Sequence, residues 1–157
     1  PIAGTTRDAI DTHLTVDDDV TISGGDFDLK DYTLTARREV TVAAGTTLRV
    51  RGNSRLVVAN GSTARTLAVA GTLEVSGFGI VDLGDSGTVV GATLAIGGAS
   101  GSRRVRVVES GQLRMYDAVD AVSVDSGGTF ESSGSAVVSR RRRSTRWIRR
   151  PRYLRRA

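Results

Sequence analysis

Few residues of this 157-residue chain could perform chemistry. Because it contains no cysteine, it has neither a thiolate metal site nor a cysteine nucleophile, and its single histidine cannot make a histidine-based metal site. A Ser-His-Asp arrangement would have to rest on that histidine, His13, to which we assign no role. The residue types therefore point away from most familiar catalytic mechanisms.

Acidic residues cluster early in the chain, at Asp17–Asp19 and at Asp26, Asp28 and Asp31. A calcium site is one interpretation, because Ca²⁺ favours several carboxylate oxygens. The twelfth position counted from Asp26 is Arg37, where an EF-hand loop has glutamate, and no Gly-Gly-x-Gly-x-Asp repeat is present. We interpret these residues as solvated turn carboxylates, and we predict no metal and no cofactor.

Two glycine-rich passages could cradle a phosphate, at 84–87 and 97–101. Neither is followed by Gly-Lys-Ser/Thr or by a helical pattern, which a phosphate-binding loop requires. Turn geometry explains them, so we predict no catalytic residues here.

The strongest chemical signal is the C-terminal segment. Residues 140–157 contain ten arginines and no acidic residue, whereas residues 1–139 contain 12 basic and 17 acidic residues, so the formal net charge of +5 divides into −5 and +10. Because these like charges repel one another, we expect a partner of negative charge to hold the segment. The predicted contact residues are Arg140, Arg141, Arg142, Arg143, Arg146, Trp147, Arg149, Arg150, Arg152, Tyr153, Arg155 and Arg156.

Three interpretations of this tail stay open. It could dock on an acidic protein neighbour, including the acidic body of another copy, because guanidinium groups pair well with carboxylates. It could bind nucleic acid, since arginine contacts phosphates while Trp147 and Tyr153 could stack on bases. It could also reflect a compositional bias toward arginine, because Lys30 is the only lysine.

Short runs of alternating apolar and polar residues fill the rest of the chain. A period of two with β-branched residues predicts strands, and no window has the apolar spacing of a helix. Glycines such as Gly45, Gly71 and Gly111 separate the runs and are expected to supply left-handed or tight corners. The runs are Val20–Ile22, Val40–Val42, Leu48–Val50, Leu56–Val58, Leu67–Val69, Leu73–Val75, Leu94–Ile96, Val105–Val107, Leu113–Met115 and Val122–Val124.

The runs recur with a short period. We align Val20 with Val40, and Val42 with Val58 and then with Val75, as equivalent positions of successive units. This short period predicts an all-β parallel solenoid, in which stacked rungs bury a shared core and leave two open ends. We expect a cap or arm at 1–19, a body of about six to seven rungs at 20–139 and the basic tail at 140–157. A β-sandwich or jelly roll is the alternative.

The passage from Val20 to Thr35, with its Thr-Ile, Asp-Leu and Tyr-Thr-Leu-Thr phrases, resembles the opening rungs of right-handed parallel β-helices. These are the repeats of phage fibres and spikes, adhesins and pectin-lyase-like proteins. The resemblance implies a fold more than an activity. The chain lacks the Asn-Thr-Asp and Gly-His-Gly patterns of the polygalacturonases.

From this resemblance and the tail, we expect a non-enzymatic structural protein of a viral or phage particle, such as a capsid decoration, spike or tail-associated component. It would associate with itself, as a trimer by analogy with fibres, and with other virion proteins. No signal peptide and no apolar run of membrane-spanning length occurs, so we expect a protein made in the host cytoplasm and located in the virion. The initial Pro1 is what remains when a starting methionine is removed, so we expect a complete mature chain. A nucleic-acid-binding module and a carbohydrate-binding or carbohydrate-cleaving β-helix are the alternatives.

Overall fold

A computed structural model describes residues 13–58, 63–84, 91–116 and 121–140. Within these ranges every regular element is a β-strand, and the strands form three parallel sheets. Sheet 1 contains β1 (His13–Val16), β4 (Thr33–Ala36), β7 (Arg55–Val58), β10 (Ile80–Leu83), β13 (Gln112–Met115) and β16 (Val137–Arg140). Sheet 2 contains β2 (Val20–Ile22), β5 (Val40–Val42), β8 (Arg65–Val69), β11 (Ala92–Ile96) and β14 (Ala121–Val124). Sheet 3 contains β3 (Asp26–Asp28), β6 (Thr47–Val50), β9 (Thr72–Val75), β12 (Arg104–Val107) and β15 (Thr129–Ser132).

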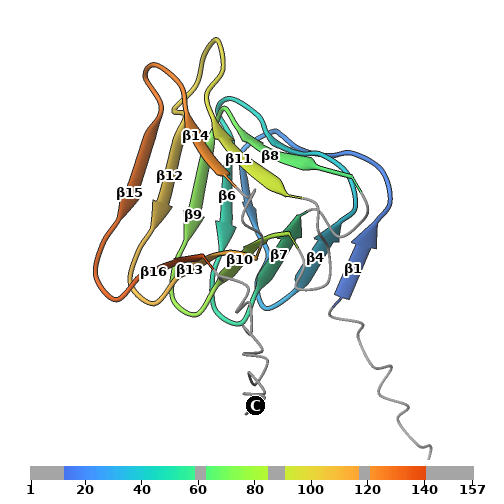
Figure 1. Ribbon diagram of the computed structural model, residues 1–157, viewed down its shortest axis with the longest axis vertical. Helices are drawn as coiled ribbons and strands as arrows, with labels where there is room; N and C mark the ends of the chain where they lie inside the picture. Colours follow the sequence, from blue (N-terminus) through green and yellow to red (C-terminus); the bar gives the residue numbers. More distant parts are fainter. Residues whose placement is uncertain (1–12, 59–62, 85–90, 117–120, 141–157) are drawn as a thin grey trace, which may run out of the picture.

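The chain visits the three sheets in turn and so winds into a three-sided column (Figure 1). All the described strand pairs are parallel, and each joins one coil to the next. The stacked parallel sheets are compatible with the predicted β-solenoid. A sandwich or jelly roll does not fit, because such folds pair their strands antiparallel.

The coils differ in length, and the later ones are longer than the sequence spacing indicated. His13 pairs with Thr33 in the first coil, whereas Ile80 pairs with Gln112 farther along the column. The predicted alignment of Val42 with Val58 and Val75 is wrong, because these three residues lie on three different sheets. The predicted count of six to seven rungs is not confirmed: the described strands form five coils of three strands and one strand of a sixth.

The coils extend beyond the predicted body at both ends. β1 lies within the segment that we expected to be a cap, yet it pairs with β4 as part of sheet 1. At the other end, β16 reaches Arg140, the first residue of the predicted tail, which lies opposite Met115. Residues 1–12 and 141–157 lie outside the described residues.

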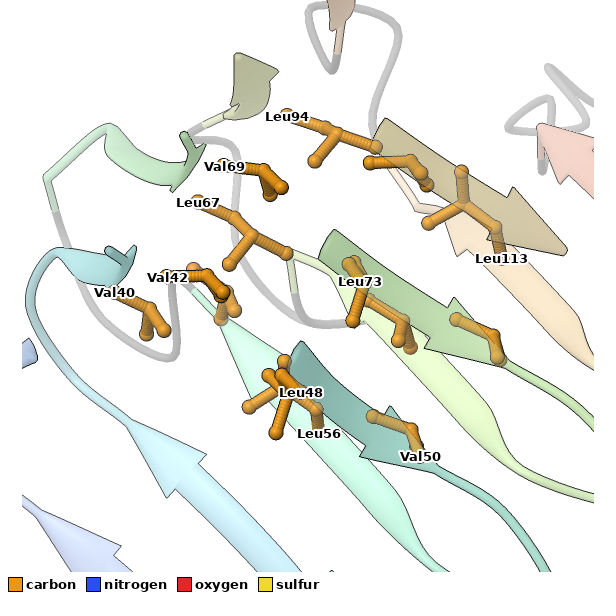
Figure 2. Packing of buried hydrophobic residues seen from close by; sticks show 14 of the residues in the cluster. Val40, Val42, Leu48, Val50, Leu56, Leu67, Val69, Leu73, Leu94 and Leu113 are labelled. Carbon is orange, nitrogen blue, oxygen red and sulfur yellow. The ribbon is translucent and has the colours of Figure 1, made fainter. Parts of the chain in front are cut away.

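The core consists of aliphatic columns that run along the axis. Because successive strand side chains point to opposite faces, every second residue of a strand points inward, and parallel pairing stacks it on its counterpart in the next coil. Leu48 lies on Leu73, and Leu67 lies between Val40 and Leu94 (Figure 2). All of these side chains are fully buried. Burying each one contributes about 1.5–3 kcal/mol, and it requires a coil on either side.

Candidate assembly surfaces

The first coil, β1 to β3, leaves two of its inward side chains largely exposed. Leu14 is 59% exposed and Phe27 47%, although both stand in columns that are buried elsewhere. Together with Val20, Ile22 and Leu34, they line a hollow of about 330 Å³. We call this surface the first-coil end. It is an apolar surface of the kind that marks an interaction site.

The other end of the column is also apolar. Val124 of β14 is 48% exposed and Val138 of β16 is 41% exposed, while Phe130 of β15 is partly buried against the core. We call the outer surface of β14 to β16 the last-coil end. Among the described strands, β1 to β3 and β14 to β16 are the edges of their sheets, so each lacks a neighbouring strand on one side. Such edges favour association with another chain.

A ladder of alternating charge runs along the outer face of sheet 3. Arg49 Nη1 lies 2.7 Å from Asp26 Oδ2, and Arg106 Nη1 lies 3.0 Å from Glu74 Oε2. Because these side chains are partly exposed, each ion pair adds little stability. If a strand of sheet 3 paired one coil away from its native partner, however, side chains of like charge would lie opposite each other. The ladder therefore specifies the order of the coils. Its paired column is Asp28, Arg49, Glu74, Arg106 and Glu131.

The ladder gives the stability a pH dependence. A hydrogen bond from Arg49 holds the pKa of Asp26 below its usual 3.8, and hydrogen bonds from Arg104 and Arg106 hold the pKa of Glu131 below its usual 4.5. A carboxyl group whose pKa is lower in the folded than in the unfolded protein stabilises the fold at pH values above its unfolded-state pKa. This stabilisation is lost as the pH falls through the folded-state pKa.

We therefore expect the thermal midpoint to fall as the pH is lowered below about 4. The double substitution Arg104→Gln and Arg106→Gln should reduce this fall, because Glu131 then titrates near its usual value. Arg65→Gln is the matched control, since Arg65 Nε donates to the carbonyl oxygen of Arg37 and not to a carboxylate. Equal pH slopes for the double variant and the control, measured by circular dichroism, would contradict this assignment.

Asp82 is an exception among the outward side chains. It stands on the outer side of β10 but is fully buried, and it forms an ion pair with Arg55 of the preceding coil. Its Oδ1 atom has no hydrogen-bond partner. Its neighbours in the outward column are Val57 and Arg114, so no second carboxylate stands beside it there.

The early acidic cluster has a structural role that our interpretation as solvated carboxylates missed. Asp17 accepts a hydrogen bond from Arg37, and Asp28 accepts one from Arg51 at 2.7 Å. Asp31 Oδ1 accepts a hydrogen bond from the backbone N–H of Asn53. Residues 17–19 and 37–39 are separated by the same number of positions as Val20 and Val40. This equal spacing was the sequence signal that could have predicted contacts between the two segments. These carboxylates therefore link the first coil to the second.

The predicted contact residues of the tail are only partly placed. Arg140 ends β16, at the last-coil end. The others, from Arg141 to Arg156, lie outside the described residues. In the described ranges, no group of three or more His, Cys, Asp or Glu side chains could hold a metal ion. No helix of the described part is long and apolar enough to cross a membrane.

No protein-family model, curated protein or solved structure matches this chain. The resemblance to β-helix repeats therefore rests on the sequence phrases and the parallel strand topology. The surfaces that the described residues offer for a function are the two apolar ends and the charged outer faces.

Proposed function

We propose that this protein is a non-enzymatic structural component of a viral or phage particle, which associates with itself and is anchored by its arginine-rich tail. The observation that carries the proposal is the combination of a repetitive column, whose described end strands are sheet edges with exposed apolar side chains, with a strongly basic segment directly after the last described strand. Such a molecule has surfaces suited to assembly.

The finer parts of the proposal come from the resemblance to fibre and spike repeats. They are a right-handed winding, a trimeric state, the role of capsid decoration, spike or tail-associated component, and location in the virion. The division of charge supports the anchoring role, because a tail with a net charge of +10 and a body with a net charge of −5 can bind different partners.

Truncation tests the role of the tail. A chain ending at Arg140, which keeps β16 whole, is expected to retain a β-type circular dichroism spectrum and the full chain's thermal midpoint. It should fail to co-purify with the structural proteins that the full chain captures, because the arginine contacts are gone. A truncated chain that unfolds, or that captures the same proteins, would contradict an anchoring tail.

Nucleic acid is the competing partner, favoured by the arginines together with Trp147 and Tyr153. If the tail neutralises phosphates, the affinity for single-stranded DNA should fall with salt, with a logarithmic slope of roughly −0.7 per phosphate. Recovery of nucleic acid instead of protein with the full chain would replace the anchoring proposal with this one.

A further inference from the structure

We propose that copies of this protein stack head to tail, so that the first-coil end of one copy covers the last-coil end of the next. The inference rests on the proposed self-association and names its surfaces. A second copy fits because both ends belong to the same three-sided column and both present apolar side chains in the inward columns.

The strand order determines how the next copy is turned. The described strands begin and end in sheet 1, so the strand following β16 along the same winding would fall in sheet 2. To continue all three ladders, β1 of the next copy must therefore pair with β14, β2 with β15 and β3 with β16. The next copy is rotated by one face of the column.

This rotation places most inward apolar residues on apolar residues, although Ile22 of β2 would face Ser132 of β15. If the inward residues of β1 in one copy are placed opposite the inward residues of β14 in the other, Leu14 faces Val122 and Val16 faces Val124. In the same way, Val20 of β2 faces Phe130 of β15. The exposed columns of both ends would then be covered as they are inside each copy.

Stacking without the rotation is less favourable. If β1 met β16, with which it shares a sheet, β2 and β3 would lie one coil away from β14 and β15, so two of the three ladders would be interrupted. With the rotation, the acidic residues of the outer ladder meet uncharged polar residues: Glu131 lies beside Thr21, and Asp28 beside Ser139.

Charge also favours the head-to-tail direction. The first coil carries Asp17–Asp19, and the side chains of Asp17 and Asp18 remain 75% and 87% exposed despite their arginine partners. At the opposite end, β16 leads directly into residues 141–157, which contain nine arginines and no acid. Because the two ends therefore differ in charge, a junction of unlike ends is favoured over a junction of like ends, which brings like charges together.

Two end variants test the proposal by sedimentation velocity over a micromolar to submillimolar concentration series. Leu14→Glu alters only the first-coil end, and Val124→Glu only the last-coil end. Each is expected to weaken self-association at least about tenfold, because a carboxylate replaces an apolar contact. Mixing the two variants should restore a one-to-one pair through the remaining intact ends. Phe78→Glu is the matched control, since Phe78 is exposed midway along the column, between β9 and β10.

Three outcomes would overturn head-to-tail stacking. One is a wild-type protein that stays monomeric throughout the series. Another is loss of association with only one end variant, which indicates a junction of like ends. The third is loss with Phe78→Glu, which indicates lateral association. Circular dichroism of each variant verifies that it is folded. A monomeric protein that still enters a particle through its tail would contradict the stacking and the self-association, and would leave the anchoring role of the tail intact.

Discussion

Replacing Leu67 with aspartate is expected to unfold the protein, whereas the same change at the next residue, Ala68, is expected to leave it folded. Leu67 is fully buried between Val40 and Leu94, so an aspartate there would lose the leucine packing and bury an unpaired charge. Lost core packing costs about 2–5 kcal/mol and the charge several more. The sum is comparable with the whole stability of a domain, about 5–15 kcal/mol.

Ala68 is the matched control because it lies on the same strand and points outward. Its neighbours in adjacent coils are Thr41 and Ala95, and it is partly exposed, so a carboxylate there keeps contact with water. We expect its effect to stay within about 1 kcal/mol. Far-ultraviolet circular dichroism and urea denaturation of both variants provide the measurement. A folded Leu67→Asp protein, or an unfolded Ala68→Asp protein, would reverse the assignment of the inner and outer faces of β8.

This pair of residues shows what the sequence could predict. Strict alternation correctly assigned Leu67 and Val69 to the inner face, because the period of a strand is two. It could not identify which run stacks on which. Val42 lies opposite Val69 of the next coil and not on the sheet of Val58. Connections between strands vary in length and carry no periodic signal, so the true repeat was hidden.

The sequence predicted that the column would have open ends, but it did not predict which residues form the candidate surfaces. Open ends follow from any short solenoid, yet naming the exposed side chains requires knowing which coil is first. Leu14 fell within the predicted cap, since a single short strand has too little alternation to be recognised. The acidic cluster illustrates the same difficulty, because Asp28 acquires its arginine partner, Arg51, only when the second coil is stacked on the first.

The glycines at the corners were assigned one role in the sequence and have two in the structure. Gly45 has a φ of 74°, in the left-handed region, as expected. Gly71, Gly79 and Gly111 are absent from the residues with positive φ, so backbone conformation does not require glycine there. They are required by close approach, because a Cβ atom at Gly79 would lie against the carbonyl oxygen of Val50, one coil below.

Gly79→Ala is therefore expected to lower the free energy of unfolding by about 3 kcal/mol, the upper part of the usual range for overpacking. The added methyl group would also lie 2.9 Å from the backbone nitrogen of Arg51. The Val50 carbonyl cannot simply move away, because it accepts a hydrogen bond from the backbone N–H of Ser76 at 3.1 Å. Relief of the clash must either separate two coils or break this bond.

Gly45→Ala is the control, since a Cβ atom there meets no atom within 4 Å and only the left-handed conformation opposes it. We expect this change to cost about 1 kcal/mol. Urea denaturation of both variants measures the difference, and an unchanged slope of the unfolding free energy against urea concentration indicates that unfolding exposes the same amount of surface. If Gly79→Ala lowers the free energy of unfolding no more than Gly45→Ala does, the two coils are farther apart at this corner than a clash with the Val50 carbonyl would need. A larger cost at Gly79 indicates that coil spacing, and not turn conformation, requires glycine immediately before β10.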